Sequence, residues 1–186
     1  MHTALVLIDV QESFRQRPYW VEAQAQPFLN VCNALVAGCL AQKIPVLRVL
    51  HSDGPATATN PFAMESGHVR PLDGLLEFAH AAQFVKHRHS ALVGTGLSVW
   101  LHENKIHRLI VAGIRTEQCC ETTTRHASDE GWEVDFCAEA TLTFDMQHVD
   151  GSPLAASDIV ARTTAVLNGR FATICTVGQA LDRAVC

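Results

Sequence analysis

The sequence predicts an α/β fold with three layers, in which helices cover both faces of a mainly parallel sheet of about six strands. Two observations carry this prediction. Apolar, strand-like segments alternate with helical segments along the chain, and several of the strands are apolar along nearly their whole length. Such strands are typical of a parallel sheet that is buried on both faces. A length of 186 residues suits a single domain, which we expect to span residues 1–186.

The individual elements follow from local patterns. Strands are expected at 3–10, 45–50, 82–87, 107–114, 132–140 and 171–177. Helices are expected at 27–42, 95–104, 116–131 and 153–168, with a short helix in the C-terminal tail. The segment 52–73 is rich in Gly, Pro, Ser, Thr and Asp and is interpreted as a long loop. Loops of this length are usually functional or mobile, so this one is a candidate for shaping a binding site.

Charge and cysteine content exclude several classes of protein. The net charge is −5 and no basic tract occurs, so we expect no nucleic-acid partner and no anionic membrane surface. No apolar run reaches the length of a membrane span, and the N-terminal segment lacks the pattern of a secretory signal. Seven cysteines, an odd number without a C-x-x-C pair, favour a reduced, cytoplasmic protein. Five of them are expected to be small packing residues, namely Cys32, Cys39, Cys137, Cys175 and Cys186.

The turn after the strand 107–114 carries the two remaining cysteines side by side. Thr116 is placed to cap the helix that follows, which puts Cys119 in its first turn. Backbone N–H groups and the helix dipole there favour a thiolate, so we expect a lowered pKa for Cys119. Cys120 lies about 100° further around the helix and faces elsewhere.

Two charged residues end other predicted strands. Asp9 ends the first strand and Lys86 the third, and the carboxyl ends of parallel strands meet at one edge of a sheet. Burial would raise the pKa of Asp9, which suits a general base or acid. The residues alone leave two interpretations open. Asp9, Lys86 and Cys119 form a nucleophilic site, or Asp9 and Lys86 form a structural ion pair beside the crevice.

Three motifs resemble one family. LVLIDVQESF (5–14), FVKHRHSAL (84–92) and VAGIRTEQCCETTTRHASDEGWEV (111–134) resemble the isochorismatase-like cysteine hydrolases, which include nicotinamidases and carbamoylsarcosine amidohydrolases. The resemblance runs from about residue 3 to 143, in the order and spacing of the family. The pattern G-x-x-T-[DE]-x-C at 113–119 is its most specific part and selects Cys119 rather than Cys120 as the nucleophile.

The resemblance implies a role for each of these residues. Asp9 would be the general base and acid, Lys86 would orient and stabilise the charges, and Cys119 would attack a carbonyl to form an acyl-enzyme. A cis peptide bond that does not involve proline is expected between Ile114 and Arg115, with the amides of Arg115 and Cys119 as the oxyanion hole. Phe14 matches a pocket-wall aromatic residue in relatives, although a core aromatic residue under the sheet edge is an equal alternative.

Departures from the family narrow the chemistry. Isochorismatases that act on a vinyl ether lack the cysteine, so Cys119 favours hydrolysis of a C–N bond in an amide or ureido group. Nicotinamidases carry a D-x-H metal motif, whereas this loop has only His51, Asp53 and His68, in another order. We therefore expect no metal and no cofactor. Two alternatives remain: a metal-assisted hydrolase of the nicotinamidase type, and a catalytically idle member that binds a small molecule or a partner.

The sequence leaves several roles open. Arg115 either recognises an anionic or carbonyl-bearing substrate, or forms a salt bridge with Glu117 or Glu121 across a subunit contact. His87 and His89 would share a face of a strand, and a surface or interface role is favoured over metal binding. The expected partners are a small-molecule substrate and further copies of the chain, in a homodimer or larger homo-oligomer. The loop 52–73 and the segment 142–152 are expected to shape the pocket.

Overall fold

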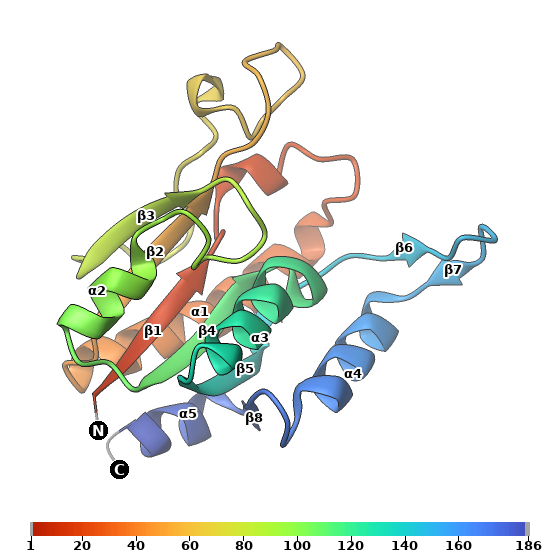
Figure 1. Cartoon of the computed structure of the whole chain (residues 1–186). Helices are drawn as coiled ribbons and strands as arrows, with labels where there is room; N and C mark the ends of the chain where they lie inside the picture. The colour runs from red at the N-terminus through yellow and green to blue at the C-terminus, as the bar shows by residue number, and fades with distance from the viewer. Residues whose placement is uncertain (1, 185–186) are drawn as a thin grey trace.

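A computed structural model describes residues 2–184 and contains a six-stranded sheet in the order β3-β2-β1-β4-β5-β8 (Figure 1). All five neighbouring pairs are parallel. The strands are β1 (Thr3–Ile8), β2 (Val46–His51), β3 (Ala82–Lys86), β4 (Arg108–Ile114), β5 (Glu133–Leu142) and β8 (Thr173–Cys175). The prediction of a mainly parallel sheet of about six strands is confirmed.

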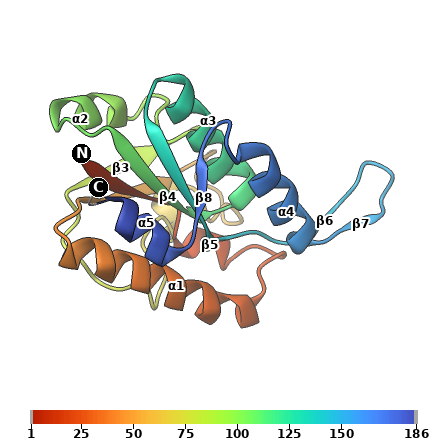
Figure 2. The same ribbon diagram turned by 90° about the horizontal axis from the view of Figure 1, so that it is seen from below.

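Helices cover both faces of this sheet. Figure 2 shows α1 and α5 on one face and α2, α3 and α4 on the other. Their bounds are α1 (Glu22–Ala41), α2 (Leu97–Glu103), α3 (Glu121–Asp129), α4 (Ala156–Leu167) and α5 (Val177–Ala184). The expected three-layer α/β/α arrangement is therefore confirmed.

Strand β1 explains how one apolar segment supports two layers. Leu5 and Leu7 belong to the core under α1, and Ala4, Val6 and Ile8 belong to the core on the other face. All five are at most 1% exposed. Because side chains alternate between the faces of a strand, only a continuously apolar strand can fill both cores.

Helix α1 begins at Glu22, five residues before the predicted start, so Pro27 lies inside it. The prediction was wrong because proline favours the first turn of a helix. Glu22 accepts hydrogen bonds from Trp20 Nε1 at 2.7 Å and from Arg15 Nε at 3.2 Å, which ties the preceding loop to the helix start. Pro27 lacks only one N–H donor, so the helix continues through it at the loss of one hydrogen bond.

A second difference lies between β5 and α4. Residues predicted to start a helix at 153 instead form β7 (Pro153–Leu154), which pairs antiparallel with β6 (Met146–Gln147). The hairpin extends away from the body of the molecule (Figure 1). Its tip is closed by Asp150 Oδ1, which accepts hydrogen bonds from the backbone and side chain of Ser152. Helix α4 therefore starts three residues later than predicted.

The cysteines expected to be packing residues are buried and free where the structure describes them: Cys32, Cys39, Cys137 and Cys175. Cys186 lies outside the described residues. Across residues 2–184, no helix has both the length and the apolar character that crossing a membrane requires.

Candidate active site

Asp9 follows β1 at the carboxyl edge of the sheet, in an unusual backbone conformation. Its φ of +53° lies in the left-handed region, which residues other than glycine rarely adopt, and its side chain is fully buried. Gly113 lies opposite Ile8 in the β1–β4 register. A Cβ on Gly113 would stand 1.9 Å from the Ile8 carbonyl oxygen, so only glycine allows the two strands to approach here.

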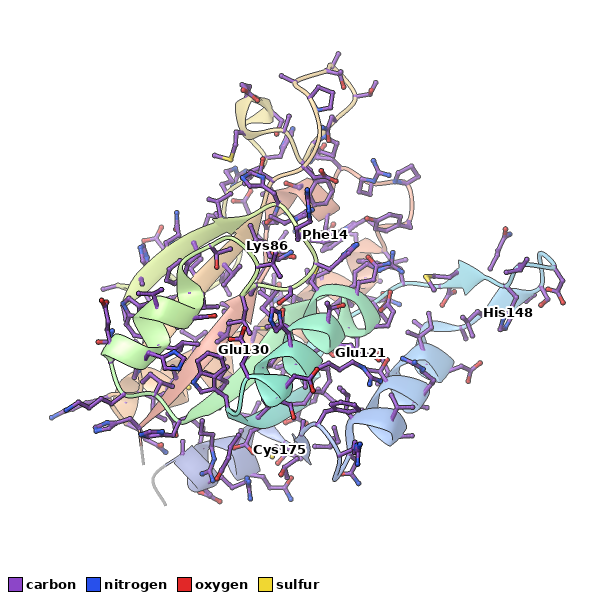
Figure 3. The ribbon with its side chains drawn as sticks, in the orientation of Figure 1. Phe14, Lys86, Glu121, Glu130, His148 and Cys175 are labelled. Atoms are coloured by element: carbon purple, nitrogen blue, oxygen red, sulfur yellow. The ribbon has the colours of Figure 1, made fainter. Side chains whose placement is uncertain are left out.

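The structure brings Asp9, Lys86 and Cys119 together from three separate strand ends. Lys86 Nζ lies 2.8 Å from Asp9 Oδ2 and donates a hydrogen bond to Cys119 Sγ at 3.2 Å. Lys86, at the end of β3, is fully buried, and Cys119 is 6% exposed. Figure 3 labels Lys86 at the end of β3 and Phe14 on the short 3₁₀ helix η1 (Glu12–Phe14).

Burial and mutual charge set the protonation of the three groups. Burial raises the pKa of Asp9, although Lys86 and Cys119 partly oppose the rise. Burial alone would lower the pKa of Lys86, but Asp9 and Cys119 raise it above its ordinary value, so the ammonium stays charged. Burial and the Asp9 carboxylate raise the pKa of Cys119 to about 12, against the opposing effect of Lys86. Cys119 therefore rests as a thiol, and the expected lowered pKa was wrong.

The local backbone explains part of that correction. Cys119 lies in a π-helical turn, η3 (Thr116–Cys120), rather than in the first turn of an α-helix. Cys120 N donates to Arg115 O at 3.2 Å, which is the i→i−5 bond of such a turn. Thr116 does not cap the helix, because its hydroxyl donates to Thr141 Oγ1 at 2.8 Å. The Ile114–Arg115 peptide bond that precedes this turn is cis.

Cys119 and Cys120 lie on different sides of the turn. Cys119 lines a cavity of about 290 Å³, whereas Cys120 is fully buried in the core between the sheet and the helices. Burial raises the pKa of Cys120 well above the usual thiol value. Of the two adjacent cysteines, Cys119 is thus the one with access to a ligand.

The cavity next to Cys119 has an aromatic wall and a polar wall. Phe14, Tyr19 and Phe62 form the aromatic side, and His51, Asp53 and His89 are among the polar lining residues. Phe14 packs edge-to-face on Phe62 with ring centroids 5.1 Å apart. Phe14 is also part of the hydrophobic core, so both interpretations of this residue describe its position.

Arg115 occupies a different place from the one expected of a substrate ligand. Its Nη2 lies 3.0 Å from Glu117 Oε1 in the same chain, and both side chains are about nine-tenths buried. The guanidinium stands over the rings of Tyr19 and Phe144, at 5.2 and 5.6 Å. Arg115 is not among the residues that line the cavity, so its side chain holds the turn against the aromatic residues.

Glu121, the other partner considered for Arg115, connects helices α3 and α4. Its carboxylate is 2.6 Å from Arg162 Nη1 and 2.9 Å from Arg125 Nη2, and it accepts a hydrogen bond from Thr163 Oγ1 at 3.1 Å. Glu121 points toward α4 in Figure 3. Within the chain, Arg115 therefore pairs with Glu117 rather than with Glu121.

The donor set of a nicotinamidase-type metal site does not assemble. Among residues 2–184, no group of three or more His, Cys, Asp or Glu side chains is placed to hold a metal ion. His51 and Asp53 line the cavity of Cys119, but His68 lines a separate one with Arg17 and Glu65. His51 Nδ1 also faces Lys86 Nζ at 3.2 Å and is already engaged. The residues present do not fit a metal at this position.

Several lining residues could not be assigned from the sequence. His51 and Asp53, which the sequence showed only as residues that do not match the metal motif, both line the cavity. His87 and His89 separate, because β3 ends at Lys86 and the strand alternation does not extend to them. His87 Nδ1 donates to Ser52 O at 2.7 Å, whereas His89 Nδ1 lies 3.9 Å from Cys119 Sγ. The loop 52–73 contributes to the cavity as expected, but no described residue of 142–152 lines it.

Comparison with known proteins agrees with this geometry. Residues 3–170 match the isochorismatase domain family. The chain belongs to the isochorismatase family. It is 27% identical over 184 residues to the uncharacterized isochorismatase family protein YrdC of Bacillus subtilis, an alignment that covers 96% of this chain and 94% of that protein.

Two further proteins are similar to the chain, one in sequence and one in structure. The chain is 28% identical over 153 residues to nicotinamidase 3 of Arabidopsis thaliana, which covers 76% of this chain and 74% of that protein. The crystal structure of a cysteine hydrolase from Pseudomonas syringae superimposes with a TM-score of 0.88 and 21% identity, covering 99% of this chain and 92% of that one. At that identity the structural likeness shows the fold alone. The family match and the nicotinamidase relative support a hydrolase of the isochorismatase family.

Proposed function

We propose that this chain hydrolyses the C–N bond of a small amide or ureido compound through an acyl intermediate on Cys119. One observation carries the proposal: a carboxylate, an ammonium and a thiol meet at three strand ends beside a cavity of about 290 Å³. A thiol with a base and a fixed cation within reach is the arrangement that covalent catalysis by cysteine requires. The nicotinamidase relative supports an amide-type bond.

The first half of the reaction forms the acyl-enzyme. Asp9 takes the proton of the Cys119 thiol, and Sγ attacks the carbonyl carbon of the substrate. The raised pKa of Asp9 makes its carboxylate a stronger base, and the Lys86 cation stabilises the thiolate as it forms. The backbone amides of Arg115 and Cys119 are assigned to the oxyanion. The C–N bond then breaks, and the proton on Asp9 passes to the leaving nitrogen.

The second half returns the enzyme to its resting state. Water adds to the thioester carbonyl, the C–S bond breaks, and the acid product leaves while Sγ regains a proton. The reaction consumes one water for each bond hydrolysed and requires no electron transfer. A cavity with aromatic and polar walls suits a small, partly apolar substrate.

The adjacent cysteines provide a matched test. Cys119→Ser and Cys120→Ser change the same atom at neighbouring positions, and a panel of small amides and ureides is assayed by release of ammonia or amine. We expect Cys119→Ser to lower kcat by on the order of 10³-fold or more, and Cys120→Ser to retain activity. Equal activity in both variants would refute the assignment. Binding of a panel compound by calorimetry, without turnover by wild type, would support the idle binding protein instead.

A further inference from the structure

The base that activates the hydrolytic water must be reached from the cavity. Asp9 and Lys86 are fully buried, and neither lines the cavity, whereas Cys119 does. Lys86 Nζ also has four neighbours within 3.2 Å for its three N–H bonds: Asp9, Cys119, His51 and the carbonyl of Arg88. Water that enters after the amine has left therefore meets the lining side chains of the cavity first.

Two imidazoles line the cavity, and they differ in what they can do. His51 Nδ1 faces Lys86 Nζ at 3.2 Å, and burial together with Lys86 lowers the pKa of His51 to about 4. His51 thus remains neutral and holds a proton poorly. His89 is exposed to solvent, and its Nδ1 lies 3.9 Å from Cys119 Sγ. Only His89 combines access to water with proximity to the reacting sulfur.

We propose that His89 is the general base that activates water in the removal of the acyl group from Cys119. This inference rests on the proposed function and adds a catalytic residue to it. His89 takes a proton from water as the oxygen forms its bond to the thioester carbon. When the C–S bond breaks, the same imidazole returns the proton to Sγ, its immediate neighbour. The imidazole is neutral again, the Cys119 thiol is restored, and Asp9 is left ionised for the next cycle.

Titratable and charged groups from several elements of the site face His89. Asp9 and His51 interact electrostatically with His89, from the ends of β1 and β2. Cys119 faces it from η3, with Lys86 of β3 hydrogen-bonded to the same sulfur. Asp53 and Arg17 are the remaining charged side chains of the cavity lining. The buried Asp9 carboxylate therefore stabilises, by electrostatic attraction, the imidazolium of His89 that forms during the reaction.

The test uses p-nitrophenyl acetate, an ester that acylates a reactive thiol and reports acylation and deacylation separately. The variants are His89→Gln and, as a matched control, His87→Gln, because His87 donates to Ser52 O and does not line the cavity. In His89→Gln we expect a full burst of p-nitrophenolate, followed by a steady rate lower by on the order of 10²-fold. Intact mass should show one acetyl group, on Cys119. His87→Gln should turn over like wild type.

The outcomes separate the two proposals. Normal steady turnover in His89→Gln, or loss of its burst as well, overturns the role of His89 while the nucleophile stands. If the acetyl-enzyme accumulates in Asp53→Asn rather than in His89→Gln, Asp53 is the base for deacylation and the inference is overturned. If wild type releases p-nitrophenolate no faster than Cys119→Ser does, the proposed function fails and the inference fails with it.

Discussion

Replacing Gly113 with alanine should disturb the fold and the site together. The new Cβ would lie 1.9 Å from the Ile8 carbonyl oxygen and 2.7 Å from the Ile8 carbonyl carbon. Strands β1 and β4 would have to separate by more than an ångström, which breaks their hydrogen bonds at this pair. A φ of +133° adds backbone strain. Strain of about 1–3 kcal/mol and overpacking of about 1–3 kcal/mol together predict a loss of about 4 kcal/mol of unfolding free energy.

Urea unfolding measures the loss, and two other glycines calibrate it. Gly131→Ala places a Cβ in open space at a φ of +94°, so we expect only the strain of about 1–2 kcal/mol. Gly178→Ala lies in α5 with open space and should be neutral or stabilising. Because Ile8 precedes Asp9, hydrolysis by Gly113→Ala should fall even where the variant is folded. A loss below that of Gly131→Ala would refute the close approach of the strands.

Three further predictions follow from the charged groups. Because the pKa of Cys119 is raised to about 12, its rate of alkylation by iodoacetamide should still increase with pH above about pH 9. A rate that stops increasing near pH 8.5, about the pKa of a free thiol, would contradict this prediction. Asp9→Asn removes a negative charge that raises the pKa of Cys119, so alkylation of Cys119 at a given pH should become faster. Hydrolysis should fall by on the order of 10²-fold, because the base is lost. Slower alkylation in this variant would refute the effect of Asp9 on the pKa of Cys119. Glu121→Ala removes the buried carboxylate that pairs with Arg162. The Arg162 side chain is 60% exposed and can be hydrated instead, so we expect the unfolding free energy in urea to fall by about 2 kcal/mol. Glu130→Ala, a more exposed carboxylate of the same helix region, should lose less than about 1 kcal/mol, and equal losses would refute the difference in burial.

Much of the fold follows from hydropathy alone. Strands β1 and β4 are apolar on both faces, which only a sheet between two helical layers can bury. Helix α1 was placed too late because a proline within a helix cannot be distinguished from a proline at its start by pattern alone. The β6–β7 hairpin carries no alternating apolar signal, and its two-residue strands are too short to be predicted from residue type.

The sequence was sufficient to predict those parts of the site whose positions depend only on where the strands end. Asp9, Lys86 and Cys119 come together because parallel strands share one carboxyl edge, which the order of the elements implies. The protonation of Cys119 was not predictable, because the sequence indicates a helix start but neither the depth of burial nor the nearby carboxylate. His89 was missed for a similar reason: its position depends on where β3 ends and how the chain turns afterward.

Strand β3 lies at the edge of the sheet, and this place has a consequence for the stability of the candidate site. It pairs only with β2, whereas β1 and β4, which position Asp9 and the nucleophile, have neighbours on both sides. Edge elements open at lower free energy than central ones. Detachment of five residues, Ala82–Lys86, is enough to withdraw the only ammonium hydrogen-bonded to the Cys119 sulfur in the described chain. We therefore expect heating to break the contact between Lys86 and Cys119 before the central strands β1 and β4 separate.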